Sequence, residues 1–222
     1  MRKIIFPVLC FLSLAAAGGL LMAQAPGATP LGQIVCNFLG RLDFDAQRNA
    51  QFRSYFTALP GLDADDLFVN GENSEKAARF TIVSTPIRVE FTRVGLVIQG
   101  RIVPASGDAS RHRVYYNPLP INRSFDRPDS FADGELIATF RAHETMVSAI
   151  PLLPASAVSV LELESSKSIV LAGRSINLAQ FSPAIRAHFF GGPTPAARSD
   201  APSLSFPVSG YAVAVTPSPR AQ

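Results

Sequence analysis

Cysteine and tryptophan are scarce: the 222 residues contain two cysteines, Cys10 and Cys36, and no tryptophan. Cys10 lies in a segment that we expect to be removed, and the single cysteine that remains cannot form an internal disulfide. The mature chain must therefore be held together by a hydrophobic core. Cys36 alternates with Ile34 and Phe38, which predicts a small inward-facing side chain. A reactive thiol is the alternative, although no cation lies close enough in sequence to lower its pKa.

Catalytic motifs are also lacking. The sequence has no G-x-S-x-G elbow, no S-x-x-K and no glycine-rich phosphate loop, and its histidines, His112, His143 and His188, lack the spacing of a zinc-protease helix. We therefore assign no catalytic residue. An enzyme whose residues assemble across strands stays an alternative, with His143, Arg141 and neighbouring acids as candidates. That alternative requires a histidine that shares a cleft with a carboxylate.

Neither sign of charge dominates. The formal net charge is +3, and loss of Arg2 and Lys3 would leave +1. The chain shows no basic stripe for nucleic acid and no polybasic patch for a membrane surface. Beyond Lys3 the lysines are Lys76 and Lys167, and this preference for arginine is typical of a GC-rich bacterial genome.

The first 25 residues are typical of an export signal. Arg2 and Lys3 precede an apolar run over residues 4–22, and Ala23-Gln24-Ala25 places small residues where signal peptidase reads them. A proline and a glycine pair within the run disfavour a retained membrane helix. The leucine before Cys10 disfavours a lipoprotein signal. We expect cleavage near Ala25 and a secreted or periplasmic protein that meets the membrane only through this signal.

A period of two dominates the rest of the chain, as is typical of half-buried strands. Apolar residues alternate with polar ones over 34–44 (Ile34, Cys36, Phe38, Leu42, Phe44), 79–84 (Phe80, Ile82) and 134–147 (Leu136, Ala138, Phe140, Ala142, Met146). Further runs rich in valine and isoleucine cover 158–164, 167–173 and 204–215. Prolines and glycines punctuate these runs. The sequence therefore predicts an all-β fold, an antiparallel β-sandwich or β-barrel.

The predicted organisation is a single domain. We expect a signal peptide at 1–25, a flexible segment at 26–31, the all-β domain at 32–215 and a disordered tail at 216–222.

The alternation changes phase once, between residues 86 and 104. The apolar positions are odd-numbered first and even-numbered afterwards (Ile87, Val89, Phe91; then Val94, Leu96, Ile98, Ile102). Such a change requires an extra residue or a reversal of the chain. Gly95 lies at the change and suits either a bulge or a tight turn, because glycine adopts positive φ without strain.

Two short stretches are candidates for helical structure. In residues 45–61, Phe52, Phe56 and Leu59 are three and four apart, but Phe52, Ser54 and Phe56 also alternate, and we favour a strand. Residues 182–192, SPAIRAHFFGG, predict one helical turn that ends at the glycine pair.

The stretch that most resembles a metal site is LDADDLFVNGEN, residues 62–73, with four acids and two asparagines. A helix–loop–helix calcium loop that started at Asp63 would need oxygen ligands and glycine where the chain has leucine and phenylalanine. We therefore predict a polar turn, in which Asn70-Gly71 favours a type I′ hairpin. A looser calcium site at Asp63, Asp65 and Asp66 is the alternative, and calcium is the one cofactor considered.

Candidate binding residues lie on two predicted strands. Arg111, Arg113 and Tyr115 form a stripe that could grip an anion or a sugar, as exposed sheet faces often do without function. Arg141 and His143 share the polar face of another strand. The inward faces carry almost no charge, so they either pack together or line an apolar cavity, as in small barrels.

The sequence leaves the function open between three classes. The leading interpretation is an exported, non-enzymatic binding or envelope-associated β-domain, whose partner would be a small ligand or an envelope protein. The first alternative is a small-molecule carrier, a closed barrel with an apolar lumen. A lumen of roughly 300 Å³ or more would support the carrier, and a packed interior would exclude it. The second alternative is the enzyme.

Overall fold

A computed structural model describes residues 29–47, 49–107, 109–149, 155–192 and 204–217. The predicted signal peptide, 1–25, lies outside these ranges, as do residues 26–28 of the predicted flexible segment and 218–222 of the predicted tail. Within these ranges no helix has the length and apolar character needed to cross a membrane.

The chain is all-β, as its alternation predicts. The main sheet contains β1 (Ile34–Phe44), β2 (Asn49–Ala58), β3 (Phe80–Ser84), β4 (Ile87–Val94), β5 (Val97–Pro104), β6 (Ser110–Tyr116), β7 (Glu135–Ala149), β8 (Ala155–Ser166), β11 (Ala184–Gly191) and β12 (Leu204–Ala214). A small second sheet pairs β9 (Ile169–Leu171) with β10 (Arg174–Ile176). The helical elements are α1 (Ala64–Leu67) and the 3₁₀ turns η1 (Val69–Gly71), η2 (Pro128–Ala132) and η3 (Leu178–Gln180).

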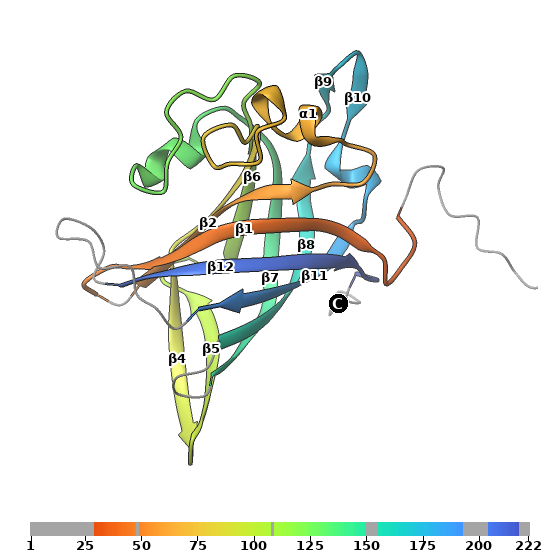
Figure 1. The fold of residues 1–222 in the computed structure, drawn as a ribbon. Helices are drawn as coiled ribbons and strands as arrows, with labels where there is room; N and C mark the ends of the chain where they lie inside the picture. The colour runs from red at the N-terminus through yellow and green to blue at the C-terminus, as the bar shows by residue number, and fades with distance from the viewer. Residues whose placement is uncertain (1–28, 48, 108, 150–154, 193–203, 218–222) are drawn as a thin grey trace, which may run out of the picture.

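The main sheet closes into a barrel. β1 pairs with both β2 and β12, and the order runs from β12 through β11 and β8 to β7, always antiparallel. A sandwich would keep separate sheet edges, whereas here the first strand joins the last. Of the two predicted architectures, the structure therefore supports the barrel. In Figure 1, β1, β2, β11 and β12 cross the front and β6, β7 and β8 form the wall behind.

Two strand pairs share the gap between β2 and β7. At one end of the barrel, β3 pairs with β2 and β6 pairs with β7; at the other end, β4 and β5 take these places. β3 leads into β4 across Thr85-Pro86, where the proline lacks the N–H that a continuous ladder requires. The result is an eight-position barrel in which one long hairpin is bent, and Figure 1 shows its β4–β5 half extending away from the body.

The phase change in this hairpin is a tight turn. Val94 pairs with Val97, and Gly95 between them has a φ of 61°. The turn reading of the sequence is therefore confirmed, and the bulge reading is wrong.

Bulges elsewhere turn several predicted inward residues outward. The register of β7 against β8 shifts between Ala142 and Glu144, so the inward positions are even-numbered before it and odd-numbered after it. Met146, predicted inward, is 53% exposed, and Thr145 is buried instead. Similar shifts place Leu136 and Ile34 outward, where the sequence alternation predicted them inward.

The two ambiguous stretches are both strands. β2 confirms the strand reading of residues 45–61. The helical turn predicted within 182–192 is wrong, because β11 is paired on both sides, with β8 and with β12. The backbone hydrogen bonds of these two ladders outweigh the weak local preference for a helical turn.

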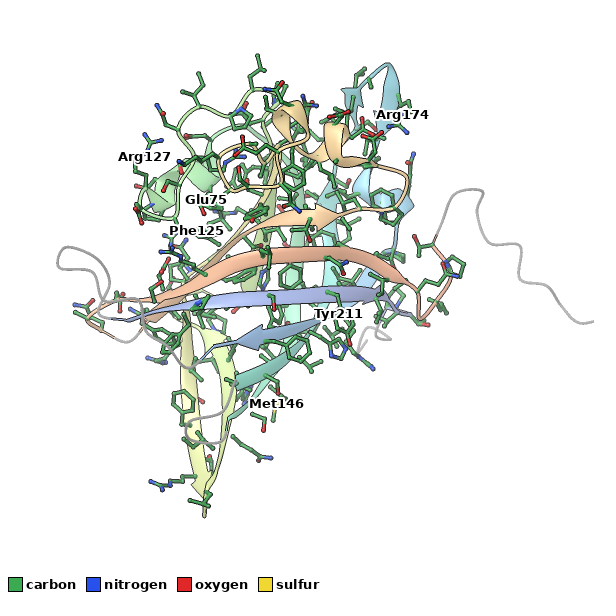
Figure 2. The ribbon with its side chains drawn as sticks, viewed as in Figure 1. Glu75, Phe125, Arg127, Met146, Arg174 and Tyr211 are labelled. Atoms are coloured by element: carbon green, nitrogen blue, oxygen red, sulfur yellow. The ribbon has the colours of Figure 1, made fainter. Side chains whose placement is uncertain are left out.

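The two ends of the barrel differ. α1, η1, η2 and the β9–β10 pair belong to the long connections at one end, and Figure 1 shows them gathered above the strands. Phe68, Phe125 and Phe131 from these connections are buried against the main core. In Figure 2 the labelled Glu75, Phe125 and Arg127 lie within this group. We call this the capped end. The opposite end holds the β1–β2 turn and the tip of the β4–β5 hairpin.

Candidate functional site

A cavity of about 330 Å³ occupies the barrel near the end opposite the cap. It is lined by residues of nine strands and by Gly192. These residues are Leu42 and Phe44 (β1), Phe52 (β2), Ile87, Val89 and Phe91 (β4), Ile98 and Ile102 (β5), Ser110 and His112 (β6), Ala142, Thr145 and Val147 (β7), Ala155, Ser156, Ala157 and Ser159 (β8), Phe189 and Gly191 (β11), Gly192, and Phe206 and Val208 (β12).

Three rings form the floor of the cavity. Phe52, His112 and Phe189 line the 330 Å³ cavity and also a void of about 50 Å³ in the capped half. The ring centroids of Phe52 lie 6.1 Å from His112 and 5.3 Å from Phe189, in edge contacts. Phe38 packs behind them, 5.7 Å from Phe52. This floor, the Phe52–His112–Phe189 septum, separates a packed half of the barrel from a hollow half.

The hollow half follows from side-chain size. β8 presents the small residues Ala157 and Ser159 to the cavity. The next inward residue toward the cap, Leu161, is large and is buried in the core. β7 changes in the same way, from Phe140 in the packed half to Ala142 beside the cavity. Small residues on one wall leave space that the aliphatic residues of the β4–β5 hairpin do not fill.

The cavity lining is apolar except for hydroxyl groups and one imidazole. None of its described residues is Asp, Glu, Lys or Arg. The hydroxyls of Thr145 and Ser159, opposite each other on β7 and β8, lie 2.6 Å apart and bond to each other. The Ser110 hydroxyl is buried and has no hydrogen-bond partner among the described residues.

His112 is uncharged at neutral pH. Burial in these apolar surroundings lowers the pKa of its imidazole from 6.5 to about 4, because a charged ring would lose its hydration without a counter-charge. A neutral imidazole offers one N–H donor and one acceptor nitrogen. No hydrogen bond of this ring to the described part of the chain is present.

The binding residues predicted from the sequence lie on the outer wall. Arg111, Arg113 and Tyr115 alternate with the inward Ser110 and His112, so they face away from the cavity.

These outer residues join a set of ion pairs. The Arg111 Nε lies 2.9 Å from a Glu164 carboxylate oxygen, and the His143 Nε2 lies 2.7 Å from Glu162. Arg141 pairs in register with Arg111 on one side and Glu162 on the other. The structure thus brings Arg111, Arg141 and His143 together as neighbours on the outside of the barrel.

The three histidines do not converge. His112 lines the cavity, His143 lies on the outer wall, and the His188 ring stacks on Tyr211 with centroids 4.9 Å apart. Figure 2 shows Tyr211 and Met146 on the outside of the barrel. The carboxylate that approaches a histidine, Glu162, is therefore outside the cavity.

The acidic stretch 62–73 forms part of the cap. Asp63 caps the N-terminus of α1 by accepting a hydrogen bond from the Asp66 N–H at 3.0 Å, and the Asp66 carboxylate pairs with Arg174. Asp65 is exposed. Among the described residues, no group of three or more His, Cys, Asp or Glu is arranged to hold a metal ion. Asn70 and Gly71 have φ of 55° and 66°, the positive values that this pair predicts, but they lie in η1 rather than in a two-residue hairpin.

Ser110 and His112 are not among the binding residues that the sequence predicts. The alternation of β6 separates Ser110, His112 and Val114 from the arginine stripe, but it does not say which set faces inward. The apolar Val114 in the same set was the available signal.

The chain matches no protein-family model, no curated protein and no solved structure.

Proposed function

We propose that this protein is a carrier, a binding barrel that holds a small and largely apolar molecule in its lumen. The observation that carries the proposal is the cavity of about 330 Å³, which reaches the size range of small-molecule sites, about 300–1,000 Å³. Binding an apolar ligand against its aliphatic and aromatic lining would be favourable, because apolar surface would be removed from water.

The size of the cavity sets the scale of the ligand. At about 30 Å³ for a water-sized group, 330 Å³ accommodates roughly ten such groups. The ligand is therefore a small molecule rather than a lipid with two long chains.

A cavity-filling substitution tests the proposal. Ala157 faces the cavity from β8, and Ala157→Phe places a ring in the space that the ligand would occupy. The matched control is Val158→Phe, one residue along the same strand, where the side chain is 36% exposed on the outer wall. We expect a neutral hydrophobic fluorophore, N-phenyl-1-naphthylamine, to bind the wild type and Val158→Phe but not Ala157→Phe. Equal binding to all three folded proteins would contradict the carrier function.

We further propose that the carrier works outside the cytoplasm, supported by the charged, apolar and small-residue segments of residues 1–25. Expression of the full chain in a bacterium and mass measurement of the protein from the periplasm or medium would test this. A mature chain that begins at Pro26 is expected. An intact N-terminus in the cytoplasmic fraction would contradict export and leave the carrier proposal unaffected.

A further inference from the structure

Two polar residues of the cavity lining lie at the floor or next to it. Ser110 and His112 are two residues apart on β6, so both point into the lumen on the same side. The other polar pair, Thr145 and Ser159, has its hydroxyls bonded to each other. Ser110 and His112 are therefore two neighbouring polar residues of one strand, and unlike Thr145 and Ser159 they have no hydrogen-bond partner among the described side chains; Ser156 lines the cavity from β8.

Ser110 is the strongest indication of a ligand. The residue is 5% exposed, and its Oγ finds no partner among the described residues. Burying an unpaired hydroxyl is destabilising, and buried polar groups in folded proteins are nearly always bonded. Alanine would fit the same space without this cost. An unpaired hydroxyl on a residue that lines an apolar cavity is consistent with a partner that arrives with the ligand.

The charge of the site narrows the class of ligand. A carboxylate or ammonium group in this cavity would lose its hydration, and none of the described lining residues could neutralise it. A pure hydrocarbon would avoid that loss but would leave Ser110 unpaired. A molecule with one neutral polar group satisfies both conditions.

On the basis of the proposed function, we propose that the cavity selects an uncharged amphiphile. Its apolar body fills the lumen between β4, β5 and β8, and its single hydroxyl or carbonyl group bonds to Ser110 and His112 beside the septum. Ser110 can donate or accept, and the neutral imidazole can do either through its two nitrogens. The pair therefore accepts an alcohol as well as a ketone.

A matched ligand series tests the polar anchor. Nonanol, nonane and nonanoate share a chain of suitable length and differ only in the head group. Each is measured by displacement of N-phenyl-1-naphthylamine from the wild type, from Ser110→Ala and from the control Ser209→Ala, an exposed serine on β12. We expect nonanol to bind best, and its affinity to fall about fivefold in Ser110→Ala, the effect of one hydrogen bond. Nonane affinity should be unchanged by Ser110→Ala, and Ser209→Ala should behave as the wild type.

The outcomes separate this inference from the carrier function. Equal affinity for nonane and nonanol, with no change in Ser110→Ala, would overturn the polar anchor and leave the carrier intact. Tighter binding of nonanoate would overturn the preference for an uncharged head group. Absence of binding for the fluorophore and all three ligands would overturn both proposals. His112→Phe, which keeps the ring and removes its nitrogens, should likewise lower the affinity for nonanol and not for nonane.

Discussion

At the residue scale, the charge state of an ionisable side chain in the lumen depends more on its burial than on its ordinary pKa. His112 illustrates this, because the apolar residues around it lower the pKa of its imidazole to about 4. Arg111, its neighbour on the same strand, faces outward and pairs with Glu164. Because successive side chains of a strand point to opposite faces, these two adjacent basic residues lie in different surroundings: His112 in the neutral lumen and Arg111 on the charged outer wall.

The half-buried His112 predicts a dependence of stability on pH. In the unfolded chain the pKa of His112 returns to 6.5, so between pH 6.5 and about 4 the unfolded state binds more protons than the folded state. Stability is therefore full above pH 6.5 and falls as the pH drops toward 4. The loss attributable to His112 between pH 7 and 4.5 is about 2 kcal/mol, from 1.36 kcal/mol per pKa unit.

Urea unfolding of the wild type and His112→Phe at these two pH values measures the effect. The variant cannot bind the proton, so its free energy of unfolding should fall by about 2 kcal/mol less than that of the wild type. Equal losses in the two proteins would show that the imidazole is solvated in the folded state.

Cys36 gives a second residue-scale prediction. Its thiol is buried, and burial raises its pKa to about 12, so the reactive thiolate is almost absent at pH 8. The small hydrophobic role predicted from the sequence is confirmed, and the reactive thiol is not supported. In a chain that starts at Pro26, which lacks Cys10, we expect Ellman's reagent to modify Cys36 only as fast as the protein unfolds. Urea should therefore accelerate labelling, and reaction of the native protein at the rate of a free thiol would contradict the prediction.

At the element scale, sequence periodicity predicts which stretches are strands but not the side to which each residue points. The alternation correctly predicts β7 as a strand, but it wrongly predicts that Met146 faces inward. The cause is the bulge beyond Ala142, which no feature of the sequence indicates. The same ambiguity applies to β6, where alternation separates Arg111 and Arg113 from Ser110 and His112 but does not show which set faces the lumen. The turn at Gly95 was predictable because glycine marks it directly. The cavity was foreseen only as one of two outcomes, because its volume depends on which small residues of β7 and β8 face one another.

The cap provides an element-scale prediction. The Arg174 guanidinium joins β10 to the β2–β3 connection through the buried Asp66 carboxylate and donates to the Gly61 carbonyl at 3.0 Å. Arg174→Ala leaves the Asp66 carboxylate without its counter-charge, and we expect the free energy of unfolding to fall by about 1–3 kcal/mol. The matched control is Lys167→Ala, which breaks an exposed pair with Glu135 and should cost about 0.5 kcal/mol or less. Denaturant unfolding measures both, and equal effects would show that Asp66 does not depend on Arg174.

At the scale of the whole molecule, the interior of the barrel has one packed half and one half that contains a cavity. The capped half is packed with aromatic and aliphatic side chains, and it supplies the core that a chain without an internal disulfide requires. The opposite half leaves a space of about 330 Å³ unfilled. An empty apolar space lacks the dispersion contacts of a packed core, so the packed half must compensate for the hollow one.

The septum between the halves fixes the depth of the cavity, and this gives the last prediction. Phe52 lines both the 330 Å³ cavity and the 50 Å³ void, so Phe52→Ala should join them and remove part of the packed core. We expect a loss of about 3–5 kcal/mol in the free energy of unfolding. We also expect the chain length of the alcohol that binds best to increase, because the floor recedes toward the cap. The control is Phe44→Ala, which lines the same cavity from the last residue of β1, away from the septum, and should leave the preferred length unchanged. A folded Phe52→Ala protein with the wild-type length preference would show that the septum does not set the depth of the binding site.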